Sequence, residues 1–219
     1  MVVAETRIVT PSGAVSASLH GSGERVVALG HGAGSTRTYP ALVALAEAIG
    51  ASGRLCVLYN FPYTEAGGRR PDRPEALEAT TRAVADHARQ SLGARTLVLG
   101  GRSMGGRIAS QAVAKGVVAE GLVFLAYPLH PPGRPEQLRD KHLSAIPAPM
   151  LFVQGTRDDF ARADLLSDVL ARLSDRATFH SVEGGDHSFG VLKRSGRTTA
   201  QVRDEVHATV LAWLEARGL

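Results

Sequence analysis

The stretch that decides the fold is Gly101-Arg102-Ser103-Met104-Gly105, which has the pattern Gly-x-Ser-x-Gly. An apolar run typical of a buried strand, residues 96–100, precedes it, and a helix-like run, residues 107–115, follows it. Glycines are needed two positions to either side of the serine, because bulkier residues would collide with the adjoining strand and helix. The pattern predicts a sharp strand-to-helix turn that exposes Ser103 as a nucleophile at the C-terminal edge of a sheet. Glycine and serine also favour ordinary turns, so this interpretation needs partner residues elsewhere.

Length and composition limit the class of protein. The 219 residues suit one domain, 1–219, because they can bury a sizeable core but are too few for two ordinary domains and a linker. Hydrophobic residues make up 44% and charged residues 21%, which is typical of soluble globular proteins. No apolar stretch approaches the roughly 20 residues that span a bilayer, and the N-terminus lacks the apolar core of a secretory signal. We therefore expect a cytoplasmic protein with no membrane partner.

Several other classes of site find no support. Cys56 is the only cysteine, which excludes an internal disulfide and a cysteine-based metal cluster, and its apolar neighbours predict a buried, unreactive thiol. The net charge of +4 is spread over the chain without a basic block, so no nucleic-acid partner is expected. Gly30-x-Gly32 begins like a dinucleotide-binding motif, but Ser35 occupies the position of the third glycine. With no phosphate-binding loop and no dense metal-ligand spacing, the sequence predicts neither a cofactor nor a metal.

Short apolar runs alternate with longer helical patterns along the chain. This alternation predicts an α/β fold with a mostly parallel sheet and helices on both faces. The turn Pro11-Ser12-Gly13 predicts that the first two strands form an antiparallel hairpin. The eight expected strands are 2–10, 14–20, 25–30, 54–60, 95–100, 121–127, 150–154 and 177–182, and the expected helices are 39–49, 74–92, 104–115, 162–173 and 199–217. The proline-rich segment 127–149, with a short helix candidate at 136–143, is long enough for a rim but not for a cap domain.

A serine nucleophile needs a base, and the base needs an acid that orients it. Asp158 lies in the loop after the strand 150–154, on the same sheet edge as Ser103, with Asp159 as the alternative. His187 follows the next strand in the flexible stretch after Gly184 and Gly185, which completes the chain order serine, acid, histidine. His180 and His207 are weaker candidates because they lie within a strand and a helix.

Negative charge on a substrate carbonyl oxygen would need backbone donors beside Ser103. The N–H group of Met104 is the first expected donor, because this residue directly follows the nucleophile. The second should come from the loop after strand 25–30, which reads His-Gly-Ala-Gly-Ser over residues 31–35. Its small residues allow a substrate to approach the backbone, and Ala33 is the favoured donor, with Gly32 and Gly34 as alternatives.

These motifs together resemble the α/β-hydrolase superfamily over essentially the whole chain. Four segments, 58–63, 100–107, 126–130 and 185–189, are more narrowly similar to small capless serine hydrolases related to testis-expressed protein 30 and, more distantly, to dienelactone hydrolases. Dienelactone hydrolases usually carry cysteine where this chain has Ser103, so the resemblance does not imply lactone specificity. It implies the α/β-hydrolase fold and the Ser103, Asp158 and His187 triad, without a substrate.

The resulting hypothesis is a carboxylesterase-like or thioesterase-like serine hydrolase that acts on a small acyl substrate through an acyl-enzyme, as a monomer or homodimer. A non-catalytic scaffold is the alternative, and transfer of the acyl group to another acceptor or peptide hydrolysis stays open. Arg37, Arg102 and Arg107 would favour anionic substrates. The expected pocket lining is Tyr59, Phe61, Tyr63, Tyr127 and His130, although these side chains would equally suit packing at the sheet edge.

Overall fold

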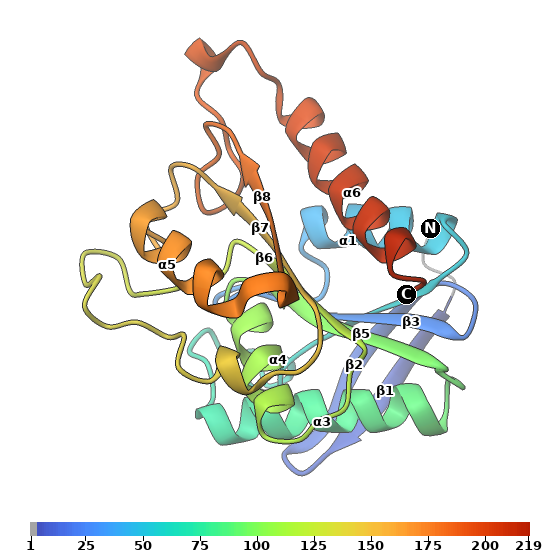
Figure 1. Ribbon diagram of the computed structural model, residues 1–219. Helices are drawn as coiled ribbons and strands as arrows, with labels where there is room; N and C mark the ends of the chain where they lie inside the picture. Colours follow the sequence, from blue (N-terminus) through green and yellow to red (C-terminus); the bar gives the residue numbers. More distant parts are fainter. Residues whose placement is uncertain (1–3) are drawn as a thin grey trace.

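One eight-stranded sheet organises the chain in the computed structural model, which describes residues 4–219 (Figure 1). The strand order is β1-β2-β4-β3-β5-β6-β7-β8; β2 runs antiparallel to β1 and β4, and every other neighbouring pair is parallel. The expected sheet with its N-terminal hairpin is confirmed, and residues 2–3 of the first predicted strand lie outside the described residues. The strands are β1 (Ala4–Thr10), β2 (Gly13–Gly21), β3 (Arg25–Gly30), β4 (Leu55–Tyr59), β5 (Thr96–Arg102), β6 (Gly121–Leu125), β7 (Met150–Gly155) and β8 (Ala177–Val182).

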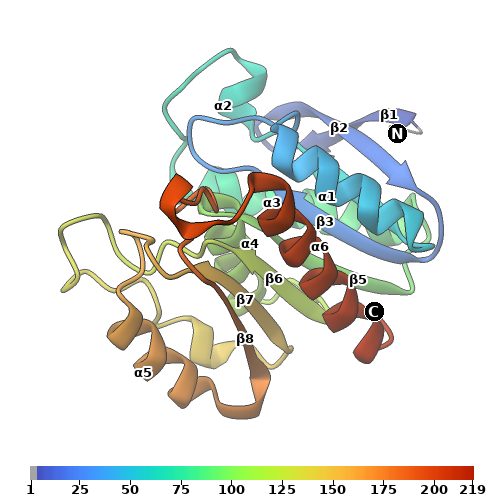
Figure 2. The same ribbon diagram turned by 90° about the horizontal axis from the view of Figure 1, so that it is seen from above.

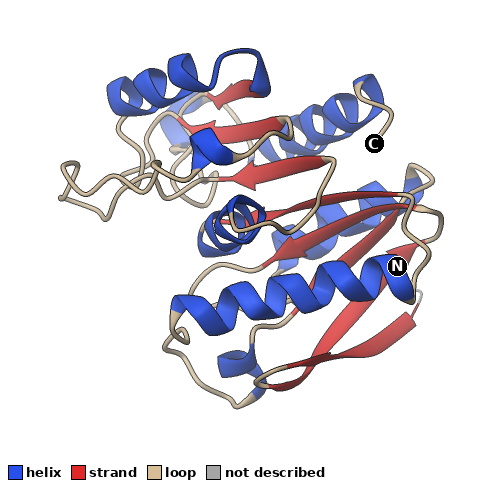
Figure 3. Ribbon diagram, turned by 60° about the horizontal axis from the view of Figure 1, so that its bottom comes forward, coloured by secondary structure: helices blue, strands red, loops and turns tan. Residues whose placement is uncertain are grey.

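Helices cover both faces of the sheet, as expected. The helices α1 (Pro40–Ala51) and α6 (Thr199–Ala216) lie on one face, and Figure 2 shows them above the strands. The other face carries α3 (Pro74–Gln90), α4 (Met104–Ala114) and α5 (Ala163–Leu173), while the short α2 (Pro62–Glu65), which the sequence analysis missed, follows β4 (Figure 3). Burial on both faces explains the nearly continuous apolar strands. In β3, Val26 and Ala28 belong to the core under α3 and α4, whereas Val27 and Leu29 belong to the core under α1 and α6.

The segment between β6 and β7 departs from one prediction. The helix expected at 136–143 is wrong, because only a 3₁₀ turn at Leu143–Ala145 forms there. The backbone of Arg139 bonds to residues outside the expected helix: its N–H donates to the carbonyl of Leu129, and its carbonyl accepts from the Tyr127 hydroxyl. The segment is therefore a rim pinned to the sheet edge, and no cap domain stands over the sheet.

Three glycines bring the end of β3 against the turn after β5. A Cβ atom added to Gly101 or Gly105 would lie 2.1 or 2.2 Å from the carbonyl oxygen of Gly30. Gly101 also has a φ of 145°, which side chains rarely permit. Only glycine allows this direct backbone contact, which fixes the turn relative to the loop that follows β3.

A buried histidine fixes that loop. His31 is fully buried, and its Nδ1–H donates to the carbonyl of Gly32 at 2.9 Å, while its Nε2 accepts from the Phe61 N–H at 3.2 Å. Burial disfavours the charged ring and lowers the pKa of His31 to about 4. The ring is therefore neutral at pH 7 and orients the backbone of the loop.

We predict that Gly105→Ala will lower the free energy of unfolding by about 3 kcal/mol or more, because the new Cβ would collide with backbone rather than with a movable side chain. Gly116→Ala, at the end of the same helix, is the matched control. A Cβ there would meet nothing within 4 Å, so only the strain of its φ of 92° remains, at about 1 kcal/mol. Chemical denaturation measures both losses, and equal losses would contradict the proposed role of the backbone contact.

We predict that His31 makes stability fall as the pH falls from 6.5 to about 4. In this window the unfolded chain protonates His31 and the folded protein does not, so the unfolded state binds more protons. At about 1.4 kcal/mol per pKa unit, roughly 3 kcal/mol of the stability present at pH 7 is lost. His31→Gln should therefore show a much smaller loss between pH 7 and 4.5 in urea unfolding. His142, whose pKa is also lowered to about 4, remains in both proteins and cancels. Identical pH dependence would refute the assignment.

Candidate active site

Ser103 occupies the turn between β5 and α4 in a strained backbone conformation. Its φ of 51° and ψ of −114° are rare for a residue with a side chain. Two backbone bonds hold it there: the Ser103 N–H donates to the carbonyl of Leu125 at 2.9 Å, and the Ser103 carbonyl accepts from the Arg107 N–H at 3.1 Å. The turn thus points the hydroxyl out of the sheet edge at the start of a helix.

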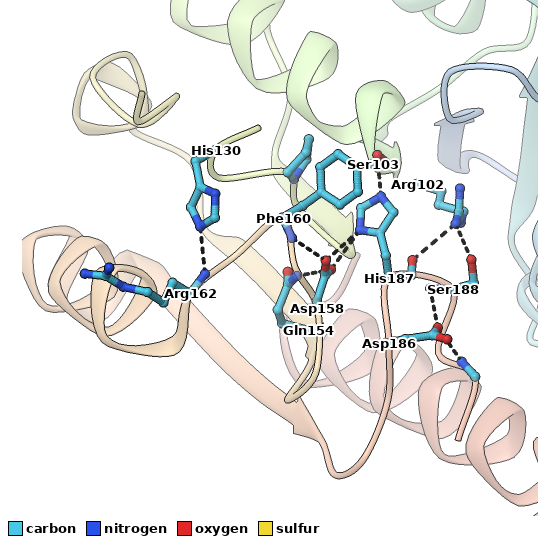
Figure 4. Close-up of polar contacts among 12 residues, drawn as sticks. Arg102, Ser103, His130, Gln154, Asp158, Phe160, Arg162, Asp186, His187 and Ser188 are labelled. Carbon is cyan, nitrogen blue, oxygen red and sulfur yellow. Dashed lines mark hydrogen bonds and ion pairs between the residues drawn. The ribbon is translucent and has the colours of Figure 1, made fainter. Parts of the chain in front are cut away.

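The structure brings Ser103, His187 and Asp158 together from three separate loops (Figure 4). The Nε2 atom of His187 lies 2.8 Å from the Ser103 Oγ, and its Nδ1 lies 2.8 and 2.9 Å from the two carboxylate oxygens of Asp158. An ionised carboxylate only accepts hydrogen bonds, so Nδ1 carries the proton and Nε2 is free to accept from the serine hydroxyl. Asp159, the alternative acid, is exposed.

Neighbouring groups satisfy and orient the buried carboxylate of Asp158. One oxygen accepts from the Gln154 side-chain amide at 2.5 Å, and the other accepts from the Phe160 N–H at 2.9 Å. The side chain of Asp158 is 0% exposed, so these donors replace the water that an ionised group requires. The carboxylate therefore has a fixed direction before any substrate arrives.

Two further side chains fix the imidazole and its loop. The ring of Phe160 stacks on that of His187 with centroids 4.1 Å apart and an interplanar angle of 25°. Arg102 donates to the His187 carbonyl at 3.2 Å and to the Ser188 Oγ at 2.8 Å, and its guanidinium lies 5.1 Å from the centre of the Tyr39 ring. Phe160 thus covers one face of the imidazole, and Arg102 ties its loop to the turn that carries Ser103.

The loop after β3 lies beside Ser103. A Cβ added to Gly32 would be 3.6 Å from the Cβ of Ser103 and 2.9 Å from a guanidinium nitrogen of Arg102. Ala33, the next residue, is exposed. Met104 is the first residue of α4, where a backbone N–H has no partner within the helix. Gly32 from the loop after β3 and Met104 from α4 therefore border Ser103 from two sides.

Four of the five residues expected to line a pocket pack instead, and the fifth, His130, lines a cavity of about 470 Å³ together with Asp158 and Arg162. Tyr59, Phe61 and Tyr127 are fully buried, and Tyr63 and His130 are nearly so. Polar atoms of three of them bond within the protein: the Tyr59 hydroxyl contacts Thr81, the Tyr127 hydroxyl donates to the Arg139 carbonyl, and His130 accepts from the Arg162 N–H at 2.9 Å. For Tyr59, Phe61, Tyr63 and Tyr127 the prediction of an accessible substrate surface is corrected to the packing alternative, because each helps to cover the apolar sheet edge.

The three arginines expected to favour anionic substrates also differ in placement. Arg37 pairs with Glu5 at 2.9 Å, and burial lowers the pKa of Arg107, which donates to Gln111. Only Arg102 lies beside Ser103, and it bonds to neutral oxygen atoms.

A second serine–histidine contact has the opposite polarity. The Ser110 hydroxyl donates to the Arg107 carbonyl at 2.7 Å, so it accepts from His142 Nε2 at 2.7 Å rather than losing its proton to it. Ser110 is also fully buried. Ser110 is therefore not a second candidate nucleophile beside Ser103.

Gln154 and Phe160 are contacts that the sequence analysis did not single out. Gln154 is the polar last position of an otherwise apolar strand segment, and Phe160 follows Asp158 by two residues. The position of Gln154 is a usable signal, because a polar residue near the end of a buried strand needs a partner at the sheet edge. Stacking of Phe160 depends on the path of the loop and has no local signature.

Residues 4–219 show no sign of metal or membrane chemistry. They contain no group of three or more metal-binding side chains and no helix long and apolar enough to cross a membrane. Cys56 is buried as expected, and burial raises the pKa of its thiol far above the ordinary value.

Solved structures of low sequence identity share this architecture. A serine hydrolase without lid from Xanthomonas campestris has a TM-score of 0.72 and 21% identity, with 96% of this chain and 94% of that chain covered. Dienelactone hydrolase from Anabaena variabilis has a TM-score of 0.77 and 18% identity, with 97% and 96% covered. A cold-adapted esterase from an Arctic intertidal metagenomic library has a TM-score of 0.72 and 17% identity, with 97% and 92% covered. At these identities the likeness shows the fold, an α/β-hydrolase fold without a lid.

A family model gives the same result from the sequence itself. It is described as an alpha/beta hydrolase domain and matches residues 23–215, from just before β3 nearly to the end of α6. The matched region includes the turn with Ser103 and the loops with Asp158 and His187. The chain therefore belongs to the α/β hydrolase domain family.

Proposed function

We propose that this chain is a single-domain serine hydrolase that cleaves small acyl esters, as a carboxylesterase or thioesterase, with Ser103, His187 and Asp158 as its catalytic triad. The observation that carries the proposal is the continuous hydrogen-bond chain from the Ser103 Oγ through both nitrogens of His187 to the buried Asp158 carboxylate. Membership of the family and the esterase among its structural neighbours support the reaction class.

In the first half-reaction, His187 Nε2 takes the Ser103 proton while Oγ forms a bond to the substrate carbonyl carbon. Nδ1 keeps its proton and stays bonded to the Asp158 carboxylate, which stabilises the imidazolium without taking the proton. The tetrahedral intermediate then collapses, the ester bond breaks, and His187 donates its new proton to the departing alcohol or thiol. An acyl-enzyme on Ser103 remains.

The backbone N–H groups of Met104 and Ala33 would hold the oxygen of the tetrahedral intermediate. Such donors matter because they are already oriented when the negative charge develops. The start of α4 adds the positive end of the helix dipole on the same side. The contact of Gly32 with Ser103 supports this placement of the loop.

In the second half-reaction, His187 removes a proton from water, the hydroxide attacks the acyl carbon, and the bond to Ser103 Oγ breaks with return of a proton. These side chains carry both steps, so the proposal includes no cofactor and no metal. The narrower similarity to proteins related to testis-expressed protein 30 and to dienelactone hydrolases supports the fold and the triad, with serine in place of the usual cysteine of the latter, and it names no substrate.

The triad predicts a steep loss of activity on substitution. Hydrolysis of p-nitrophenyl acetate should fall about 1000-fold or more in Ser103→Ala and His187→Ala, and about 100-fold or more in Asp158→Asn, whose amide favours the wrong tautomer of His187. The exposed neighbour provides the control Asp159→Asn, which should retain the wild-type kcat/KM. A fluorophosphonate should label the wild type and not Ser103→Ala. Wild-type turnover equal to that of Ser103→Ala on every ester would instead favour the scaffold alternative.

Arg102 should act by positioning the His187 loop rather than by chemistry. We predict that Arg102→Met will lower kcat for p-nitrophenyl acetate about tenfold with a small change in KM, because the lost hydrogen bonds loosen the base and not the binding of so small an acyl group. Arg197→Met is the control, since Arg197 also donates to a carbonyl near this loop, that of Glu183, but far from the imidazole. A fall in kcat of equal size in both variants would show general loosening instead.

A further inference from the structure

An apolar cavity of about 450 Å³ lies between the N-terminal halves of α1 and α6. Its volume is within the range of small-molecule sites. Apolar side chains from both helices and from the sheet edge form most of its wall, chiefly Leu42, Leu45, Leu125, Phe189, Val202 and Val206.

The lining of this cavity includes chain neighbours of the proposed catalytic residues, although neither Ser103 nor His187 lines it. Arg102 and Ser188 line it, and they directly precede Ser103 and directly follow His187 in the chain. The carbonyl of Leu125, another lining residue, accepts the Ser103 N–H. Figure 4 shows Arg102 and Ser188 on one side of His187, with His130 and Arg162 on the other side.

The lining defines the chemistry of an occupant. None of the lining residues, all within the described chain, is acidic, and Arg102 and Ser188 bond to each other. The other polar lining residues are Tyr39, Thr199, Arg203 and His207, of which Arg203 pairs with Asp204. A chain of methylene groups would therefore exchange water for apolar contacts along the apolar part of the cavity wall.

The cavity suits the acyl side of the ester better than the leaving group. The leaving group must receive its proton from His187 Nε2, the atom that faces the Ser103 Oγ. The cavity instead lies beside the main chain at His187, where Arg102 bonds to the carbonyl oxygen. The helix α1, which forms one wall of the cavity, follows the loop after β3 in the chain. That loop is expected to hold the carbonyl oxygen of the acyl group.

We propose that this cavity is the acyl-chain subsite and that the enzyme prefers unbranched aliphatic acyl groups of about six to eight carbons. The proposal rests on the proposed function. Each methylene moved from water into the cavity should raise kcat/KM about fourfold at most. From p-nitrophenyl butyrate to p-nitrophenyl octanoate the wild type should gain at least tenfold, whereas lengthening the alcohol of an acetate ester should have little effect.

A matched pair of variants tests the location of the subsite. Ala44 lines the cavity, and Ala48 lies one turn further along the same helix and outside the lining. Ala44→Phe should lower the octanoate-to-acetate ratio of kcat/KM at least tenfold, and Ala48→Phe should leave this ratio within twofold of the wild type. If Ala44→Phe does not fold, Ala41→Phe at the exposed mouth of the cavity takes its place, with the same expected loss.

A binding measurement separates the subsite from the chemistry. In Ser103→Ala, sodium octanoate should shift the methyl NMR signals of Leu45 and Val206, and sodium acetate should not. An octanoate-to-acetate ratio unchanged by filling the cavity, or a gain that follows the alcohol chain, overturns the subsite while Ser103-dependent acetate hydrolysis stands. Loss of Ser103-dependent hydrolysis on every ester would overturn the proposed function instead, and the NMR shifts alone would then decide whether the cavity binds aliphatic chains.

Discussion

The backbone contact of Gly30 with Gly101 and Gly105 is the constraint on which the rest of the site depends. It joins the end of β3 to the turn after β5 without an intervening side chain. The strain at Ser103 costs of order 1–3 kcal/mol, and the two backbone hydrogen bonds of this residue return about 1 kcal/mol each. Packing of the turn supplies the rest of the free energy that offsets the strain. The close packing of the glycines therefore allows Ser103 to project from a strained turn. The same contact places Gly32 beside Ser103, which ties the expected oxyanion donors to the nucleophile.

A second glycine contact unites the acid and the base. A Cβ at Gly155 would lie 2.2 Å from the carbonyl oxygen of Gly185, and the Arg157 N–H donates to that same oxygen at 2.8 Å. The loops after β7 and β8 are therefore packed directly against each other, and together they contain Asp158 and His187. The Arg102 guanidinium donates to the His187 carbonyl. It therefore links the turn that carries Ser103 to the loops that carry Asp158 and His187.

The sequence predicted what depends on strand order and missed what depends on loop paths. Parallel strands end at one edge, so residues after β5, β7 and β8 had to meet there, and Asp158 faces His187 as its position after β7 implied. The helix expected at 136–143 failed because long-range bonds of Arg139 replaced local ones. The aromatic residues near the edge carry no signal that separates lining from packing. Their burial follows from how α2 and the 126–149 rim fold over them, which no local pattern records.

The burial of these aromatic side chains bears on the reaction itself. With Tyr59, Phe61 and Tyr127 committed to the core and no lid above the sheet, Ser103 and His187 stay partly accessible to solvent. Transfer of an acyl group to another acceptor requires exclusion of water from the acyl-enzyme, which a closing element usually provides. An open site leaves water as the most available acceptor beside His187. This openness supports hydrolysis over transfer in the proposed reaction, with the proposed acyl subsite between α1 and α6 as the source of selectivity for the acyl group.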